Sequence, residues 1–210
     1  MAFNIQSIMG TIYRDKISRI ASAYQAAKMP FELEIRQVHS ESDAFERKVL
    51  AGSAFWQETS DDGEIEYDHG EAFGERLDEA EDALDGLRKA FAIFAYHTWE
   101  RGAQRWFDYS MKKPNHVDFI IALVSNNVAY DHDGLRDLNN LVNCLKHNSA
   151  TSGPNLWKDR SDLFKPGFNP SDILPLIGKP PSSVDWEDQI KLSDANISIF
   201  FDTVRISSPK

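Results

Sequence analysis

Four polar side chains recur within residues 134–148 at a spacing that places them on one side of a helix. They are Arg136, Asn140, Asn143 and His147, spaced by four, three and four residues, and we call them the polar stripe because they stack along one helical face. An arginine can hold a phosphate, and a histidine can exchange a proton near neutral pH. With amides between them, these groups suit binding of a phosphodiester and its attack by a ribose 2′-hydroxyl.

The asparagine content of the same segment also marks it as a candidate site. Residues 134–148 contain four asparagines, and each lowers helix stability by roughly 0.5 kcal/mol relative to alanine. A sequence that breaks a local rule often does so at a functional site. Three uses of the polar stripe stay open from the residues alone: structural hydrogen bonding, catalysis, and binding of a ligand or partner.

We assign roles within this helix on chemical grounds. His147 is the candidate general acid or base, Arg136 is the candidate phosphate ligand, and Asn143 completes the candidate catalytic set. Lys146 is a second candidate for contact with phosphate. The residues expected to bind substrate are Asn139, Asn140, Lys146, Glu100 and Arg101.

Glu100 and Arg101 belong to an earlier predicted helix, on which they share a face with His97 and Gln104. One interpretation places this face in the same cleft as the polar stripe. The other is a salt-bridged surface, in which Glu100 pairs with Gln104 or with a distant arginine.

Two further groups of reactive side chains lie near the stripe. Cys144 and His147 are spaced to touch on a helix and could form a thiolate dyad, although a lone helical cysteine usually packs in a core. Asp131, His132 and Asp133 resemble a metal-binding cluster only in composition, because Asp133 is expected to cap the helix that follows. We therefore expect no metal and no cofactor.

Three short motifs together resemble the HEPN superfamily, the helical domains of prokaryotic toxins and phage-defence proteins. The segment Leu-Val-Asn-Cys-Leu-Lys-His-Asn, residues 141–148, is similar to the Asn-x-x-Lys-His helix of that superfamily. Residues 96–101, Tyr-His-Thr-Trp-Glu-Arg, resemble a Trp-Glu helix in some members. A closing strand at 190–192 before a helix at 196–204 also fits, so that the resemblance covers about residues 75–206.

The resemblance implies a helical bundle, often dimeric with the active helices facing each other, that cleaves RNA without a metal. The family signature is an arginine, four to six intervening residues and then a histidine. If His147 is that histidine, the arginine should stand at positions 140–142, which hold asparagine, leucine and valine. Arg136 lies eleven residues before His147, roughly 16 Å along a helix axis. The motif is therefore degenerate, and a catalytically inactive binding or dimerisation module of the same fold is the alternative.

Apolar spacing of three and four residues predicts a mainly α protein, a helical bundle. Pro30 is expected to end the first helix. Residues 31–39 alternate like a short strand but could equally open a second helix, and residues 184–192 could form a strand or hairpin, so a small β-hairpin is part of the prediction. The expected helices are 5–29, 43–57, 71–109, 117–129, 134–148 and 194–206.

We expect one helical domain over residues 1–210. Within it, residues 58–70 are expected to be an acidic loop. Residues 154–192 should form an irregular, proline-rich extension packed on the core, because six of the nine prolines lie within this segment. The core itself should receive an apolar stripe from the 134–148 helix, namely Leu135, Leu138, Val142 and Leu145.

The net charge of −10 comes from one segment. Residues 58–85 hold 13 acidic side chains and one basic side chain, whereas the rest of the chain is close to neutral. A solvated linker is one interpretation of this segment, and an interaction segment for a basic partner is another. In the second case the protein resembles an antitoxin-like partner whose acidic segment mimics nucleic acid.

Cysteine content and hydropathy suggest the compartment. Cys144 is the sole cysteine, so no internal disulfide can form. No segment approaches the roughly 20 apolar residues that span a bilayer, and the N-terminus lacks a secretory signal pattern. We expect a cytoplasmic protein without membrane contact. The resemblance to the HEPN superfamily implies, in addition, a homodimer that binds RNA or a nucleotide and acts in a bacterial defence or toxin–antitoxin system.

Overall fold

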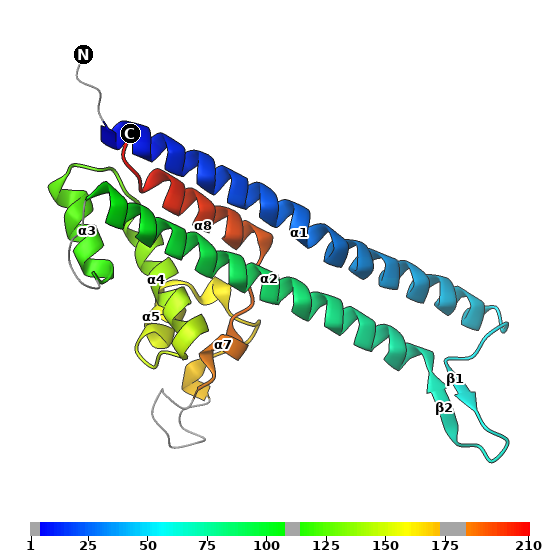
Figure 1. Ribbon diagram of the computed structural model, residues 1–210. Helices are drawn as coiled ribbons and strands as arrows, with labels where there is room; N and C mark the ends of the chain where they lie inside the picture. The colour runs from blue at the N-terminus through cyan, green and yellow to red at the C-terminus, as the bar shows by residue number, and fades with distance from the viewer. Residues whose placement is uncertain (1–4, 108–113, 173–183) are drawn as a thin grey trace. The chain divides into compact units, whose positions relative to one another are not determined.

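The computed structural model describes residues 5–107, 114–172 and 184–210 (Figure 1). It is mainly α-helical with one short antiparallel hairpin, so the predicted fold class is confirmed. The chain divides into two compact units, unit 1 with Met1–Tyr24 and Arg88–Lys210, and unit 2 with Gln25–Leu87. The elements are α1 Ile5–Leu50, β1 Gln57–Thr59, β2 Ile65–Asp68, α2 His69–Trp106, α3 His116–Ser125, α4 His132–His147, α5 Ser152–Asp159, η1 Ser161–Leu163, α7 Trp186–Gln189 and α8 Asp194–Ile206.

Pro30 does not end the first helix, so that prediction is wrong. Helix α1 continues through residues 31–39 as far as Leu50, and the strand interpretation of 31–39 is wrong as well. A proline inside a helix costs about 3 kcal/mol because it loses one backbone hydrogen bond and crowds the preceding turn. Packing within unit 2 offsets this cost, since Val38 is buried and Arg76 of α2 holds two carboxylates of α1.

The hairpin lies where an acidic loop was expected. Strands β1 and β2 pair antiparallel, with Gln57 opposite Asp68 and Glu58 opposite Tyr67. The predicted strand or hairpin at 184–192 is instead the short helix α7 and an isolated bridge between Phe164 and Ile190. The location of the hairpin was therefore wrong, because its strands have an exposed, acidic sequence without the alternation of a half-buried strand.

Helix α8 packs in unit 1 beside the first part of α1 and the second half of α2 (Figure 1). The Tyr13 hydroxyl of α1 donates to the Val204 carbonyl at 3.1 Å, and the Trp99 indole of α2 donates to the Ser207 carbonyl at 3.0 Å. The bounds of α8 agree with the prediction, and Ser193 begins it with a capping box. Three helices thus form the main layer of unit 1.

Helices α3, α4, α5 and α7 of unit 1 lie on one side of this layer (Figure 1). The predicted apolar stripe of α4 is buried at all four positions, which confirms it. The described part of the 154–192 segment contributes short helices and buries Leu156, Leu163, Trp186 and Ile190; its residues 173–183 lie outside the described part. No helix among the described residues is both long and apolar enough to cross a membrane.

Helices α2 and α3 follow the sequence pattern at their starts. α2 begins at His69 and is described to Trp106, so the predicted end at 109 lies outside the described residues. α3 begins at His116 after the N-cap Asn115, but it ends at Ser125 and not at 129. The shorter end follows from Asn127, whose positive φ of 51° is incompatible with a continuing helix.

Candidate functional site

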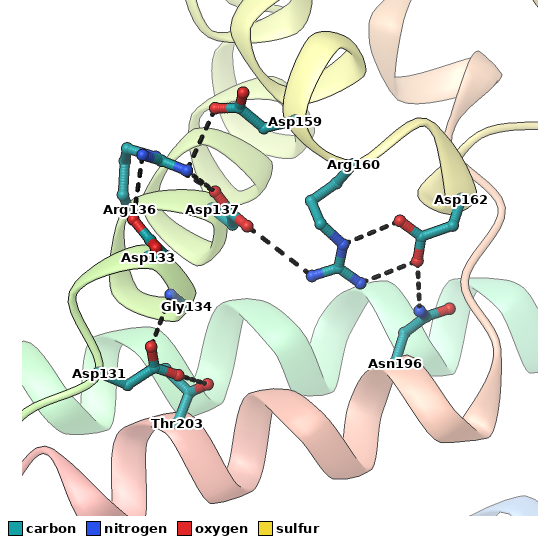
Figure 2. A network of polar contacts seen from close by, with 10 residues as sticks. All are labelled: Asp131, Asp133, Gly134, Arg136, Asp137, Asp159, Arg160, Asp162, Asn196 and Thr203. Atoms are coloured by element: carbon teal, nitrogen blue, oxygen red, sulfur yellow. Dashed lines mark hydrogen bonds and ion pairs between the residues drawn. The ribbon is translucent and has the colours of Figure 1, made fainter.

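Helix α4 is one continuous helix, as the polar stripe requires, but its N-cap differs from the prediction. Asp131, not Asp133, caps it: one carboxylate oxygen accepts from the Gly134 amide at 3.0 Å and the other from the Thr203 hydroxyl at 2.8 Å. The Asp131 carboxylate therefore ties α4 to α8 (Figure 2). Asp133 is exposed and free to pair with side chains of the first turn.

Arg136 of the polar stripe is committed to three carboxylates. Its guanidinium lies 3.2 Å from Asp133, 3.1 Å from Asp137 and 3.2 Å from Asp159 of α5 (Figure 2). These carboxylates already neutralise the cation that was expected to hold phosphate. The geometry gives Arg136 a role in joining α4 to α5.

The same network continues to α8 through Arg160. Its guanidinium lies 2.8 Å from Asp162 and 3.9 Å from Asp137, and Asp162 also accepts from Asn196 of α8 at 3.2 Å (Figure 2). Burial raises the pKa of Asp137, while the guanidinium of Arg136 opposes that change. The buried Asp137 carboxylate lies between Arg136 and Arg160, and these ion pairs have a structural role in this part of unit 1.

Asn139 and Asn143 belong to a second polar cluster, centred on Tyr96 of α2. The Tyr96 hydroxyl donates to the Asn139 amide oxygen at 2.8 Å and lies 2.9 Å from His116 Nδ1, and Asn143 Nδ2 lies 3.5 Å from the same amide oxygen. Burial raises the pKa of Tyr96 and lowers the pKa of His116 to about 4. The cluster is therefore neutral at pH 7, and it joins α2, α3 and α4 by hydrogen bonds.

The remaining candidate residues of α4 are at least partly accessible to solvent. Lys146 and His147 are exposed in the last turn of α4, and Asn140 is half-buried. The structure thus separates the proposed catalytic set: Arg136 lies in the ion-pair network, Asn143 beside Tyr96, and His147 at the helix end. Along a continuous helix, Arg136 and His147 are roughly 16 Å apart.

Glu100 and Arg101, the α2 candidates for substrate binding, have different surroundings. Glu100 Oε2 lies 2.6 Å from His97 Nδ1, so the carboxylate pairs within its own helix and not with the expected Gln104 or a distant arginine. Arg101 is exposed and lines a cleft of about 310 Å³ between α1 and α2 of unit 1.

This cleft, which we call the cationic cleft, collects three basic side chains from two helices. Lys16 comes from α1, and Arg101 and Arg105 come from successive turns of α2. Among residues 5–107, 114–172 and 184–210, no carboxylate pairs with any of the three, and no acidic side chain lines the cleft. The other lining residues are Met9, Ile12, Tyr13, Thr98, Gly102 and Trp106.

The cationic cleft has the character of a ligand site. Its floor includes Tyr13 and Trp106, whose rings meet edge to face at 4.8 Å and are almost fully buried. A volume near 300 Å³, apolar walls and a few convergent polar groups are typical of small-molecule sites. Arginines present a planar fork of donors that matches phosphate or carboxylate oxygens. The arrangement therefore suits an anion that carries an apolar or aromatic group.

The alternative chemistries have little support in the geometry. Cys144 is fully buried and burial raises its pKa to about 12, so it is not a thiolate at neutral pH, whereas His147 is exposed. Within the part of the chain that the structure describes, no three His, Cys, Asp or Glu side chains are grouped to hold a metal ion.

No family model, no curated protein and no solved structure matches this chain. The site is therefore interpreted from its own geometry.

Sequence reasoning identified Arg101 but missed the other two cations of the cleft. Arg105 could have been found, because arginines four residues apart share a helical face. Lys16 carries no local signal, since only the packing of α1 against α2 brings it to the same cleft. Tyr96, the partner of Asn139, and His116, which contacts the Tyr96 hydroxyl, were likewise missed.

Proposed function

We propose that this protein is a helical binding module that recognises RNA or a nucleotide through the cationic cleft. The observation that carries the proposal is the convergence of Lys16, Arg101 and Arg105 on one cleft without a neutralising carboxylate among the described residues. Three cations held on two helices form a preorganised site for phosphate groups.

The surroundings of the cations favour a nucleotide-type anion over a simple inorganic one. Met9 and the exposed Ile12 of α1 supply the apolar wall that a base can contact, since Tyr13 and Trp106 are almost fully buried, so that a ligand with both a phosphate and a base can satisfy both parts of the cleft. Contacts of this kind bind phosphate and a flat apolar ring without reading a base sequence. We therefore expect little sequence specificity.

A binding role also agrees with the state of the polar stripe. Arg136 is neutralised by carboxylates, and Asn139 and Asn143 take part in hydrogen bonds with the Tyr96 cluster. The HEPN resemblance around residues 141–148 supports RNA as the ligand class and places the protein in a bacterial defence or toxin–antitoxin setting. It supports equally the inactive module of that fold.

Binding to a short, fluorescently labelled single-stranded RNA tests the proposal. Replacing both arginines of the cleft, Arg101→Ala with Arg105→Ala, should weaken binding at least tenfold, since each charged hydrogen bond contributes roughly 1.5 kcal/mol or more. The matched control is Arg47→Ala with Lys48→Ala, which removes two exposed cations from the end of α1. Equal affinities for the cleft variant and the wild type would overturn the proposal.

Metal-independent cleavage of RNA is the second candidate, and one observation favours it. Lys146 and His147 are both exposed at the end of α4, where an imidazole can reach an external phosphodiester. Incubation of total RNA in EDTA with wild type and His147→Ala separates the candidates. If the wild type cleaves RNA and the substitution abolishes cleavage, the protein is a ribonuclease. If the RNA stays intact with both proteins, only the binding function remains.

A homodimer is part of the proposal, because the resemblance implies that two α4 faces meet. Light scattering of the wild type and of Asn140→Asp measures it. A shift from dimer to monomer on introducing this charge would place Asn140 at the interface, and a monomeric wild type would exclude the dimer.

A further inference from the structure

The end of unit 2 exposes an unusual number of apolar side chains. The hairpin tip, residues 50–69, begins at the end of α1, includes β1 and β2, and reaches the start of α2. Leu50 is 81% exposed, Phe55 77% and Ile65 57%, and Tyr67 is also exposed. Several exposed apolar side chains within one short segment of the chain are more informative of an interaction site than single scattered ones.

The same tip is hollowed. A shallow cavity of about 730 Å³ lies between the end of α1 and β1, lined by aromatic side chains on one part and by polar side chains, Glu58 among them, on another. His69 forms one wall: its ring lies 4.3 Å from the Phe45 ring and 4.7 Å from the Tyr67 ring, and its Nε2 lies 3.0 Å from the Glu58 carboxylate. The full lining is Phe45, Ser53, Ala54, Phe55, Gln57, Glu58, Thr59 and His69.

The rim of this cavity carries charge of one sign. Residues 49–75 contain eight acidic side chains and no lysine or arginine. A hydrogen bond from Gln57 lowers the pKa of Asp68, which therefore stays ionised at neutral pH. Unit 2 as a whole, residues 25–87, has 18 acidic and five basic side chains. The resulting potential attracts cations and repels phosphates.

We propose that the hairpin tip docks a cationic segment of another protein. An apolar or aromatic side chain of that segment enters the cavity beside Phe55 and His69, while its lysines and arginines face the carboxylates of Glu58, Glu64 and Glu66. Charge complementarity selects this occupant, because the acidic rim opposes nucleic acid and anionic lipid. The inference is separate from the proposed function, which uses unit 1.

The apolar part of the surface explains why the tip is more than a solvated acidic loop. A two-stranded hairpin is marginally stable alone in water, and both strands are exposed here. A docked segment would bury the exposed Phe55 and Ile65 and would stabilise the pairing of β1 with β2. Apolar contact and charge should therefore both contribute to affinity, and the test must separate them.

Fluorescence anisotropy with three labelled peptides makes this separation. The probe peptide contains alternating arginines and a central tryptophan; the second replaces the tryptophan by glycine, and the third replaces the arginines by glutamines. The probe should bind the full-length protein more tightly than either control peptide, and high salt should weaken it. Equal binding of all three peptides, or none, would overturn the proposal.

Variants of the protein test the same surface. Phe55→Ser should reduce probe affinity about tenfold, and Glu64→Gln with Glu66→Gln should reduce both the affinity and its salt dependence. The matched control is Asp78→Asn with Glu79→Gln, two exposed acidic residues of α2 outside the tip. If the control variant and the tip variants lose the same amount of probe affinity, the effect comes from the overall charge of the protein. That result would reject a defined docking site. The protein could instead dimerise in a concentration-dependent way, fail to bind the peptide, and lose dimerisation on Phe55→Ser. That result would assign the surface to a second copy of the chain and would also reject the proposed peptide docking.

Discussion

Arg136 Nη2 of α4 lies 3.2 Å from Asp159 Oδ2 of α5. This ion pair gives the arginine of the predicted active face a structural role, because it joins the two helices. The same guanidinium contacts Asp137, whose side chain is 8% exposed. Arg136 thus compensates a carboxylate that burial would otherwise destabilise.

Replacing Arg136 by alanine should therefore change stability more than ligand binding. We expect a loss of about 1 kcal/mol in the free energy of unfolding, a modest value because the guanidinium is 42% exposed and screened by water. Urea denaturation measures this change, and RNA affinity measured on the same preparations should stay within twofold. A large loss of affinity with unchanged stability would return Arg136 to the ligand site.

The hydroxyl of Tyr96 donates a hydrogen bond to Asn139 of α4. Tyr96→Phe removes the hydroxyl that contacts Asn139 and His116, and both half-buried groups lose this hydrogen-bond partner. The free energy of unfolding should therefore fall by roughly 1–2 kcal/mol. Tyr130→Phe is the control, because Tyr130 lies at the margin of a surface pocket. Thermal denaturation of both variants should show the larger shift for position 96.

Acid should destabilise the protein through His116. Burial, with a smaller contribution from His132, lowers the pKa of His116 from 6.5 to about 4. Between these values the unfolded chain binds a proton that the folded chain does not, so stability present above pH 6.5 is lost as the pH falls towards 4. For a half-buried ring we expect a loss of about 2 kcal/mol.

His116→Gln should remove this part of the pH dependence. The glutamine amide keeps a hydrogen-bond donor near the Tyr96 oxygen, whose own proton goes to Asn139, and comparison of the two proteins cancels the titration of all other groups. Urea midpoints measured across this pH range should fall more steeply for the wild type. Parallel curves would show that His116 is protonated in the folded state as easily as in the unfolded state.

Two glycines should respond oppositely to alanine. A Cβ at Gly153 would lie 2.1 Å from Cδ2 of the fully buried Trp186, so Gly153→Ala must displace a packed ring and should cost about 2–3 kcal/mol. Gly74 is exposed in α2 with no atom within 4 Å of such a Cβ, and Gly74→Ala should stabilise by up to about 1 kcal/mol. Thermal midpoints of the two variants should move in opposite directions.

The salt dependence of RNA affinity at the cationic cleft should report the number of phosphates that the cleft contacts. If Lys16, Arg101 and Arg105 each neutralise one phosphate, the logarithm of affinity should fall with the logarithm of salt concentration with a slope of about −2. Lys16→Ala should make that slope shallower by about 0.7. An unchanged slope would show that phosphate lies elsewhere on the protein.

The predictions from sequence succeeded where the signal is local. The bounds of α8 and the burial of Leu135, Leu138, Val142 and Leu145 follow from apolar spacing, because three- and four-residue intervals lie on one side of any α-helix. They failed at Pro30 and at the hairpin. A proline disfavours a helix interior in every sequence, so the residues around Pro30 predict a helix end. The helix continues through Pro30 because of tertiary contacts, namely the packing around Val38 and the ion pairs of Arg76.

The amino-acid sequence by itself determined the helical class, the apolar face of α4 and the acidity of residues 58–85, since each depends on composition or on helical period. Only the tertiary structure decided which polar side chains remain available. It pairs Arg136 with Asp159, places Asn139 beside Tyr96, and brings Lys16 to the same cleft as Arg101. Such partners come from separate elements, and their distance is set by how whole helices pack, which no local spacing encodes.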